Sequence, residues 1–191
     1  MFPNSPNLST LNEQQEFIIP KKRFRIRDYE YGGIALSDAS QGMFVQLWTI
    51  QYSGTNVQVH SPSSIEPTVL FTATGVTDLG LAFDQSMFPT VAYVQDGECK
   101  LRWYDTSVAE VVTTIYGNTY KDPQVTLDDA RSDSATSNDI VFSYIREGHI
   151  NFRLQRDRYL IEYATGIVAS RLIQTGMTRN MRFQFKYIGG V

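Results

Sequence analysis

VQLWTIQYSGTNVQVHS (45–61), TVAYVQDGECKLRWYDT (90–106) and DIVFSYIREGHINFRLQRD (139–157) are three stretches of one chain that share a single outline. Each has an apolar first segment, a turn with a glycine, and a second segment in which polar and apolar residues alternate. Alternation with a period of two is typical of half-buried β-strands, because successive side chains point to opposite faces of a sheet. Each stretch therefore predicts a β-hairpin, with its turn at Gly54, Gly97 or Gly148.

The hairpins form an internal repeat, because their turn glycines follow one another after 43 and 51 residues. The second and third hairpins are each preceded by an apolar segment that ends in an aspartate-containing turn, LGLAFDQS (79–86) and PQVTLDDARS (123–132). A period of about 40–50 residues is typical of β-propeller blades, and closed propellers have about four to eight blades. The chain has room for three units. It predicts an all-β fold of repeated antiparallel hairpins, either propeller-blade-like or a β-sandwich.

Other local features complete this picture. Helix is expected around 167–175, and a short helical turn is possible over 9–16. The pair Gly32-Gly33 predicts a bulge or turn at a strand end. Trp48 and Trp103 occupy similar places in two hairpins, which favours core packing, and Cys99 is expected to be buried in a strand.

The segment QRDRYLIEY (155–163) is rich in charge. Its residues Arg156, Asp157, Arg158 and Glu162 predict an ion-pair network that holds the last unit in place. Arginine outnumbers lysine by twelve to five along the chain, and arginine is the better partner in planar, partly buried ion pairs.

The first twenty residues differ from the rest, with three prolines, many polar residues and scattered apolar ones. They predict an extended N-terminal docking arm, followed over 21–191 by a single β domain with three similar hairpin units. The arm and the basic stretch after it are the expected interface with other subunits. Its candidate residues are Phe2, Leu8, Leu11, Phe17, Ile18, Ile19, Lys21, Lys22, Arg23, Arg25 and Arg27.

The net charge of −3 conceals a basic–acidic–basic layout. Five of the seven residues over 21–27 are basic, residues 66–139 hold twelve acids against four bases, and residues 153–186 hold seven bases against two acids. The layout indicates either electrostatic complementarity between copies or partners, or pairing of the two ends with the middle inside one fold. An acidic balance makes contact with nucleic acid improbable. The short apolar runs favour a protein without a membrane span or a secretory signal, made in the cytoplasm.

The sequence contains few candidates for catalytic or metal-binding residues. Asp84, Asp105, Asp128, Asp129 and Asp133 follow expected strand ends, where aspartates usually cap turns by accepting backbone N–H bonds. Paired carboxylates could instead cleave glycosidic bonds. The sequence has no D-x-D-x-D-G calcium loop, no G-x-S-x-G motif, one cysteine and two histidines. We therefore expect no catalytic, cofactor-binding or metal-binding residues.

Several stretches resemble a family of virion structural proteins from tailed bacteriophages, and together they cover most of the chain after residue 30. They are GGIALSDASQG (32–42), LAFDQSMFPTVAYV (81–94), LRWYDT (101–106), VTLDDARS (125–132), NDIVFSYIREG (138–148), FRLQRDRYLIEY (152–163) and LIQTGMTRNMRFQF (172–185). The resemblance implies a non-enzymatic component of the virion, present in many copies, at the tail or the head–tail junction. Its implied partners are other copies of itself and other phage structural proteins.

Two functions from different classes follow from the sequence. The first is assembly of the phage particle through contacts between subunits, as the arm and the resemblance indicate. The alternative is a carbohydrate-binding or glycan-cleaving tail module that uses the aspartate-rich loops at strand ends.

Overall fold

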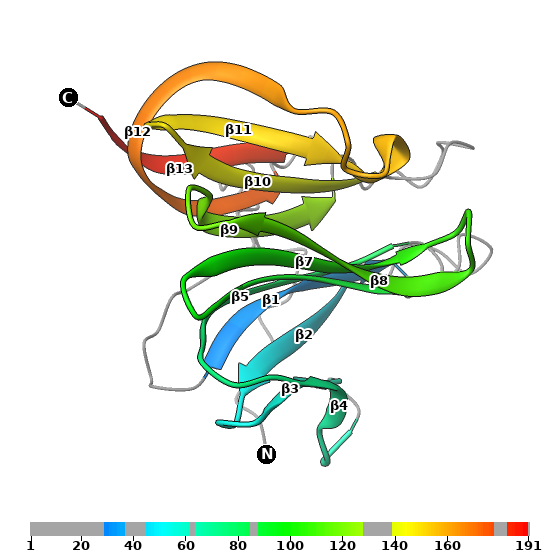
Figure 1. Ribbon diagram of the computed structural model, residues 1–191. Helices are drawn as coiled ribbons and strands as arrows, with labels where there is room; N and C mark the ends of the chain where they lie inside the picture. The colour runs from blue at the N-terminus through cyan, green and yellow to red at the C-terminus, as the bar shows by residue number, and fades with distance from the viewer. Residues whose placement is uncertain are drawn as a thin grey trace, which may run out of the picture.

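The structure is a computed structural model that describes residues 29–36, 45–61, 64–84, 88–127, 139–177 and 183–190. Within these ranges the chain folds into three antiparallel β-sheets and one short 3-10 helix, η3 (Gln155–Asp157) (Figure 1). None of the helical structure in this part of the chain is long and apolar enough to cross a membrane.

Each sheet consists of consecutive strands that pair in chain order. The first sheet contains β1 (Tyr29–Leu36), β2 (Val45–Tyr52), β3 (Asn56–His60) and β4 (Thr68–Thr72). The second contains β5 (Val76–Phe83), β6 (Pro89–Gln95), β7 (Glu98–Asp105) and β8 (Glu110–Gly117). The third contains β9 (Lys121–Leu127), β10 (Ile140–Arg146), β11 (His149–Leu154), β12 (Tyr163–Met177) and β13 (Phe183–Gly189).

The repeated hairpins are the second and third strands of each sheet, β2–β3, β6–β7 and β10–β11. Their turn glycines, Gly54, Gly97 and Gly148, have φ values of 90°, 82° and 76°. This left-handed region is open to glycine at no steric cost, which is why each tight turn has one. The repeated hairpins are therefore confirmed, as the second and third strands of a four-stranded meander in the first and second sheets and of a five-stranded meander in the third.

The second sheet lies between the other two and is covered on both faces (Figure 1). Its large side chains, including Leu79, Leu81 and Phe83 of β5, pack with Trp48 and the first sheet. Its opposite face carries the small Ala82 and Ala92 beside residues of β7, among them Trp103, and packs against the third sheet. Trp103 is buried in the second of these cores and the half-buried Trp48 packs against the first, so the predicted core packing of both tryptophans is confirmed.

The first strands of the three sheets lie near one another, since β1 contacts β5 and β5 contacts β9. Three meanders that stack face to face and bring their first strands together resemble consecutive propeller blades. The all-β prediction is confirmed, and the arrangement is consistent with both of its forms, the propeller-like fold and the β-sandwich. The predicted irregularity at Gly32-Gly33 is also present, because the pairing of β1 with β2 shifts between Tyr31 and Ile34.

The third sheet curls on itself (Figure 1). The first part of β12 pairs with β11, its second part pairs with β13, and the strand bends back until it contacts β9. A small core with Ile145, Ile150 and Leu172 lies inside the curl. The hydroxyls of Ser143 on β10 and Thr175 on β12 join across it at 2.7 Å.

The helix predicted around 167–175 is wrong, because these residues belong to β12. The pairing of β12 with β13 shifts twice, between Ala169 and Arg171 and between Leu172 and Gln174. Each shift interrupts the two-residue alternation. Ala169 and Leu172 are consequently both buried at a spacing of three, which imitates the apolar stripe of a helix. The predicted arm over 1–20 and the helical turn over 9–16 lie outside the described residues.

The reactivity of Cys99, the one cysteine of the chain, can be used to test the packing between the second and third sheets, where its side chain lies. Its side chain is buried, and burial, together with the charge of Asp78, raises the pKa of its thiol to about 12. Because the thiolate is the reactive form, we expect the native protein to resist an aromatic disulfide reagent at pH 8, and the unfolded protein to react fully. Full reaction of the native protein, measured by absorbance, would contradict this packing.

Candidate functional site

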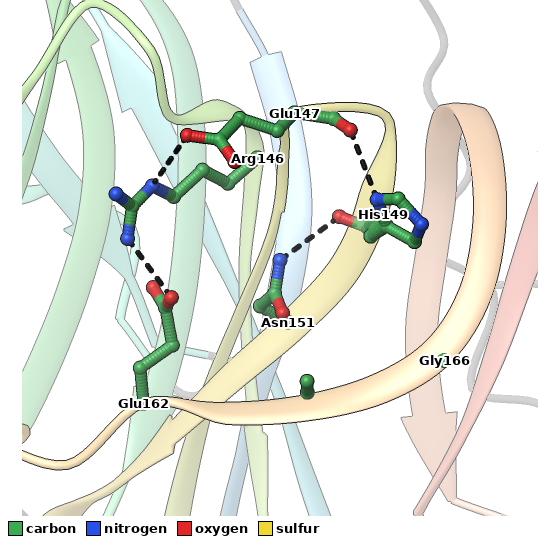
Figure 2. A pocket seen from close by; sticks show the side chains of 7 residues that line it. Arg146, Glu147, His149, Asn151, Glu162 and Gly166 are labelled. Atoms are coloured by element: carbon green, nitrogen blue, oxygen red, sulfur yellow. Dashed lines mark hydrogen bonds and ion pairs between the residues drawn. The ribbon is translucent and has the colours of Figure 1, made fainter.

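A polar pocket of about 270 Å³ lies on the third sheet, between the β10–β11 turn and the start of β12. Figure 2 shows Arg146 between the carboxylates of Glu147 and Glu162, with His149 on the far side of the turn. The complete lining is Arg146, Glu147, His149, Asn151, Glu162, Ala164 and Gly166.

Glu162 is the centre of the charged network behind the pocket. Its carboxylate accepts hydrogen bonds from the hydroxyl of Tyr144 at 2.5 Å, from Nη1 of Arg146 at 2.9 Å and from Nη2 of Arg153 at 3.3 Å. Burial by itself would raise the pKa of Glu162, but the bond from Tyr144 and the two arginine charges outweigh it and lower the pKa below its ordinary value. An ionised carboxylate that is occupied by three donors holds its neighbours in place and has little capacity to act as a general acid.

Arg153 ties this network to the interior. Its side chain is 11% exposed, and it donates to the hydroxyl of Tyr144 at 2.9 Å and to the carbonyls of Tyr159 and Leu160 at 3.0 and 2.8 Å. Its guanidinium also lies 5.2 Å from the ring centre of Tyr116, on β8 of the second sheet. One buried arginine therefore connects β10, β11, the segment before β12 and the neighbouring sheet.

His149 takes part in the turn that borders the pocket. Its Nδ1 lies 2.9 Å from the carbonyl of Glu147, and its own carbonyl accepts a bond from the side-chain amide of Asn151 at 3.2 Å. These bonds fix the shape of the β10–β11 turn. Among the described residues, no three His, Cys, Asp or Glu side chains are placed to hold a metal ion.

The aspartates that the sequence singled out are placed as follows. Asp84 accepts the backbone N–H of Phe88 at 2.9 Å, as a turn cap does. Asp105 accepts both the N–H and the hydroxyl of Ser107, at 2.9 and 2.7 Å. Asp128, Asp129 and Asp133 lie outside the described residues, and so do the eleven interface candidates over 2–27.

The four charged residues of segment 155–163 do not pair with one another: three have partners outside the segment, and Asp157 pairs with Tyr163 at its end. Arg156 bonds Asp139 at 3.2 Å, Asp157 accepts the hydroxyl of Tyr163 at 2.8 Å, and Glu162 binds Arg146 and Arg153. Arg158 reaches Asp105 at 2.5 Å and so links the third sheet to the second. Bonds from Ser107, more than that arginine, lower the pKa of Asp105.

A second candidate is the surface of β8, the last strand of the second sheet. Val111 and Ile115 are 51% and 60% exposed on one face of this strand, and Val108, in the turn before it, is 53% exposed. Val112 and Tyr116 face the other way, toward the core shared with the third sheet. Among the described strands β8 pairs with β7 alone, so its outer edge faces away from the sheet.

Sequence reasoning placed Glu162 in an ion-pair network but missed its partners Arg146 and Arg153, and it missed β8 altogether. The Arg153 network was not predicted, although Arg146, Arg153 and the tyrosines around them stand within or beside the repeated hairpin. β8 was not predicted as a strand, although its run EVVTTIYG is rich in β-branched residues, which favour strands. No protein-family model, curated protein or solved structure matches the chain.

Glu162→Gln tests the network. Losing the charge at the centre of three bonds is expected to lower the free energy of unfolding by about 1–3 kcal/mol at pH 7. Because the folded-state pKa of Glu162 is lowered, its contribution is present above the ordinary value of 4.5 and is lost as the pH falls below it. The difference between wild type and variant, measured by urea denaturation, should therefore shrink at pH 3.

Glu147→Gln is the matched control. The Glu147 side chain is 79% exposed, and its carboxylate lies 3.8 Å from Nε of Arg146. An exposed ion pair of this kind contributes little, so the change should stay within about 0.5 kcal/mol at either pH. Equal effects of the two substitutions would contradict the central position of Glu162.

Proposed function

We propose that the chain is a non-enzymatic structural component of a tailed bacteriophage particle, and that it mediates assembly at the tail or head–tail junction through contacts between subunits. The observation that carries the proposal is the surface of β8, a sheet edge that also exposes Val111 and Ile115. An unpaired edge with exposed apolar side chains is the feature that proteins normally protect unless another chain covers it.

The charged site is consistent with this role. Glu162, the most strongly coordinated carboxylate of the pocket, accepts bonds from Tyr144, Arg146 and Arg153. Asp84 and Asp105, two of the aspartates that the glycan hypothesis requires, are engaged in turn bonds. These groups support a rigid scaffold, and none of these contacts favours the glycan-binding alternative.

The proposal places the protein in the finished particle, beside other copies of itself and other structural proteins of the phage. Particles produced from the genome that encodes the chain should contain it in a fixed ratio to the other structural proteins. Quantitative mass spectrometry of gradient-purified particles measures that ratio. Absence of the chain from infectious particles would contradict the proposal.

The N-terminal residues provide a second test. A chain without residues 1–20 should keep the circular dichroism of the β domain, because every described strand begins after residue 28. It should nevertheless be missing from the purified particles, if the arm docks on neighbouring subunits as the sequence predicts. Incorporation of the shortened chain at the wild-type level would refute the role of the arm.

A further inference from the structure

We infer that β8 pairs with β8 of a second copy of this chain, antiparallel about a two-fold axis at Thr113, so that two four-stranded sheets continue as one. The inference deepens the proposed function and rests on it, since it names the partner and the contact that the exposed edge would use. The argument has three parts: the choice of edge, the register of pairing, and the charges that meet.

β8 differs from the other outer edges of the described sheets. β4 has five residues and its pairing with β3 shifts between Val57 and Gln58. β13 carries Lys186 and pairs with β12 through two shifts. β8 has eight residues, pairs without a shift from Glu110 to Ile115, and contains neither lysine nor proline. Short length, irregular pairing and lysine protect sheet edges. β8 is long and has no lysine, and its one shift, between Ile115 and Gly117, lies at the end of the strand.

The exposed face of β8 is self-complementary. Its side chains are Val111, Thr113 and Ile115, an apolar residue on either side of a threonine. When two copies run antiparallel with Thr113 opposite Thr113, Val111 of each copy lies opposite Ile115 of the other. Pairs of β-branched residues and of threonines stabilise adjacent antiparallel strands. A shift by one residue would instead place this face against the half-buried face of the second copy.

The charges are compatible with the same register. Glu110, the one charged residue of β8, comes to lie opposite Tyr116 of the second copy, so like charges do not meet. On the exposed face the neighbouring strand β7 supplies Lys100, Arg102 and Tyr104, opposite Ile115, Thr113 and Val111. The centre of the joined sheet is therefore bordered by cations, of which Lys100 is already paired with Glu98 at 3.7 Å.

The first sheet leaves this surface accessible. Arg102 of β7 lies over the ring of Phe71 on β4, at 5.0 Å, and also donates to the hydroxyl of Thr113 at 3.5 Å. The guanidinium of Arg102 thus lies at the boundary between the part of the second sheet that the first sheet covers and the part, on β8, that it leaves exposed. Val111 and Ile115, both more than half exposed, belong to the exposed part.

A disulfide tests the register directly. In the proposed pairing the two Cα atoms at position 113 are about 4.5–5.5 Å apart, within the range of about 4.4–6.8 Å that disulfides span. Thr113→Cys in the full chain should therefore become predominantly a covalent dimer under mild oxidation, as seen on a non-reducing gel. Cys99 is buried and should not compete.

Val111→Cys is the matched control, on the same strand, the same face and at similar exposure. Its two copies would be four residues apart along the strand, about 14 Å, so the variant should pair without forming a covalent dimer and should run as a single chain on the non-reducing gel. A mixture of Val111→Cys and Ile115→Cys chains should form the mixed covalent dimer. Retained circular dichroism shows that each variant is folded.

Two results would overturn the inference: no covalent dimer of Thr113→Cys, or equal cross-linking of Thr113→Cys and Val111→Cys. An uncross-linked Thr113→Cys chain whose new thiol is protected from reagents would place another segment, such as the arm, on this edge. The proposed function is judged separately. A chain found in the particle without β8 cross-linking refutes the pairing alone, whereas cross-linking of a chain absent from the particle refutes the structural role alone.

Discussion

The rest of the structure depends on the burial of both faces of the second sheet. Five successive residues of β5 and four of β6 are buried, because one face packs on the first sheet and the other on the third. Large side chains fill one interface, whereas Ala82 and Ala92 leave room for Trp103 and Tyr159 in the other. Because the other two sheets cover both faces of β5 and β6, the second sheet is exposed to solvent mainly at its last strand, β8.

The third sheet is held against this layer by charge as well as by apolar packing. Arg153 connects Glu162 and Tyr144 to the backbone near Tyr159, and Arg158 extends to Asp105 on β7. Such pairs specify geometry because arginine presents several donors in a fixed plane. They favour one placement of the third sheet on the second. On the opposite face of the second sheet, Val111 and Ile115 of β8 remain exposed.

Much of the architecture could be predicted from the sequence, because the repeated hairpins carry both the alternation and the turn glycines. What failed has a physical cause. The bulges of β12 changed the spacing of its buried residues, so that a strand imitated a helix. The Arg153 network joins residues that lie far apart along the chain, and no spacing rule brings Tyr120 and Glu162 together. The β-branched residues of β8 are enough to predict a strand. Its exposure could not be predicted, because it depends on where the first sheet ends.

Amide hydrogen exchange of the full chain, followed by mass spectrometry at low and high protein concentration, tests most directly whether β8 is the surface of assembly. The backbone groups on its outer edge should exchange quickly in the dilute protein and become protected as the concentration rises, while peptides from β4 and β13 stay unchanged. Exchange in β8 that is the same at every concentration, or protection that appears at β4 or β13 instead, would contradict the account.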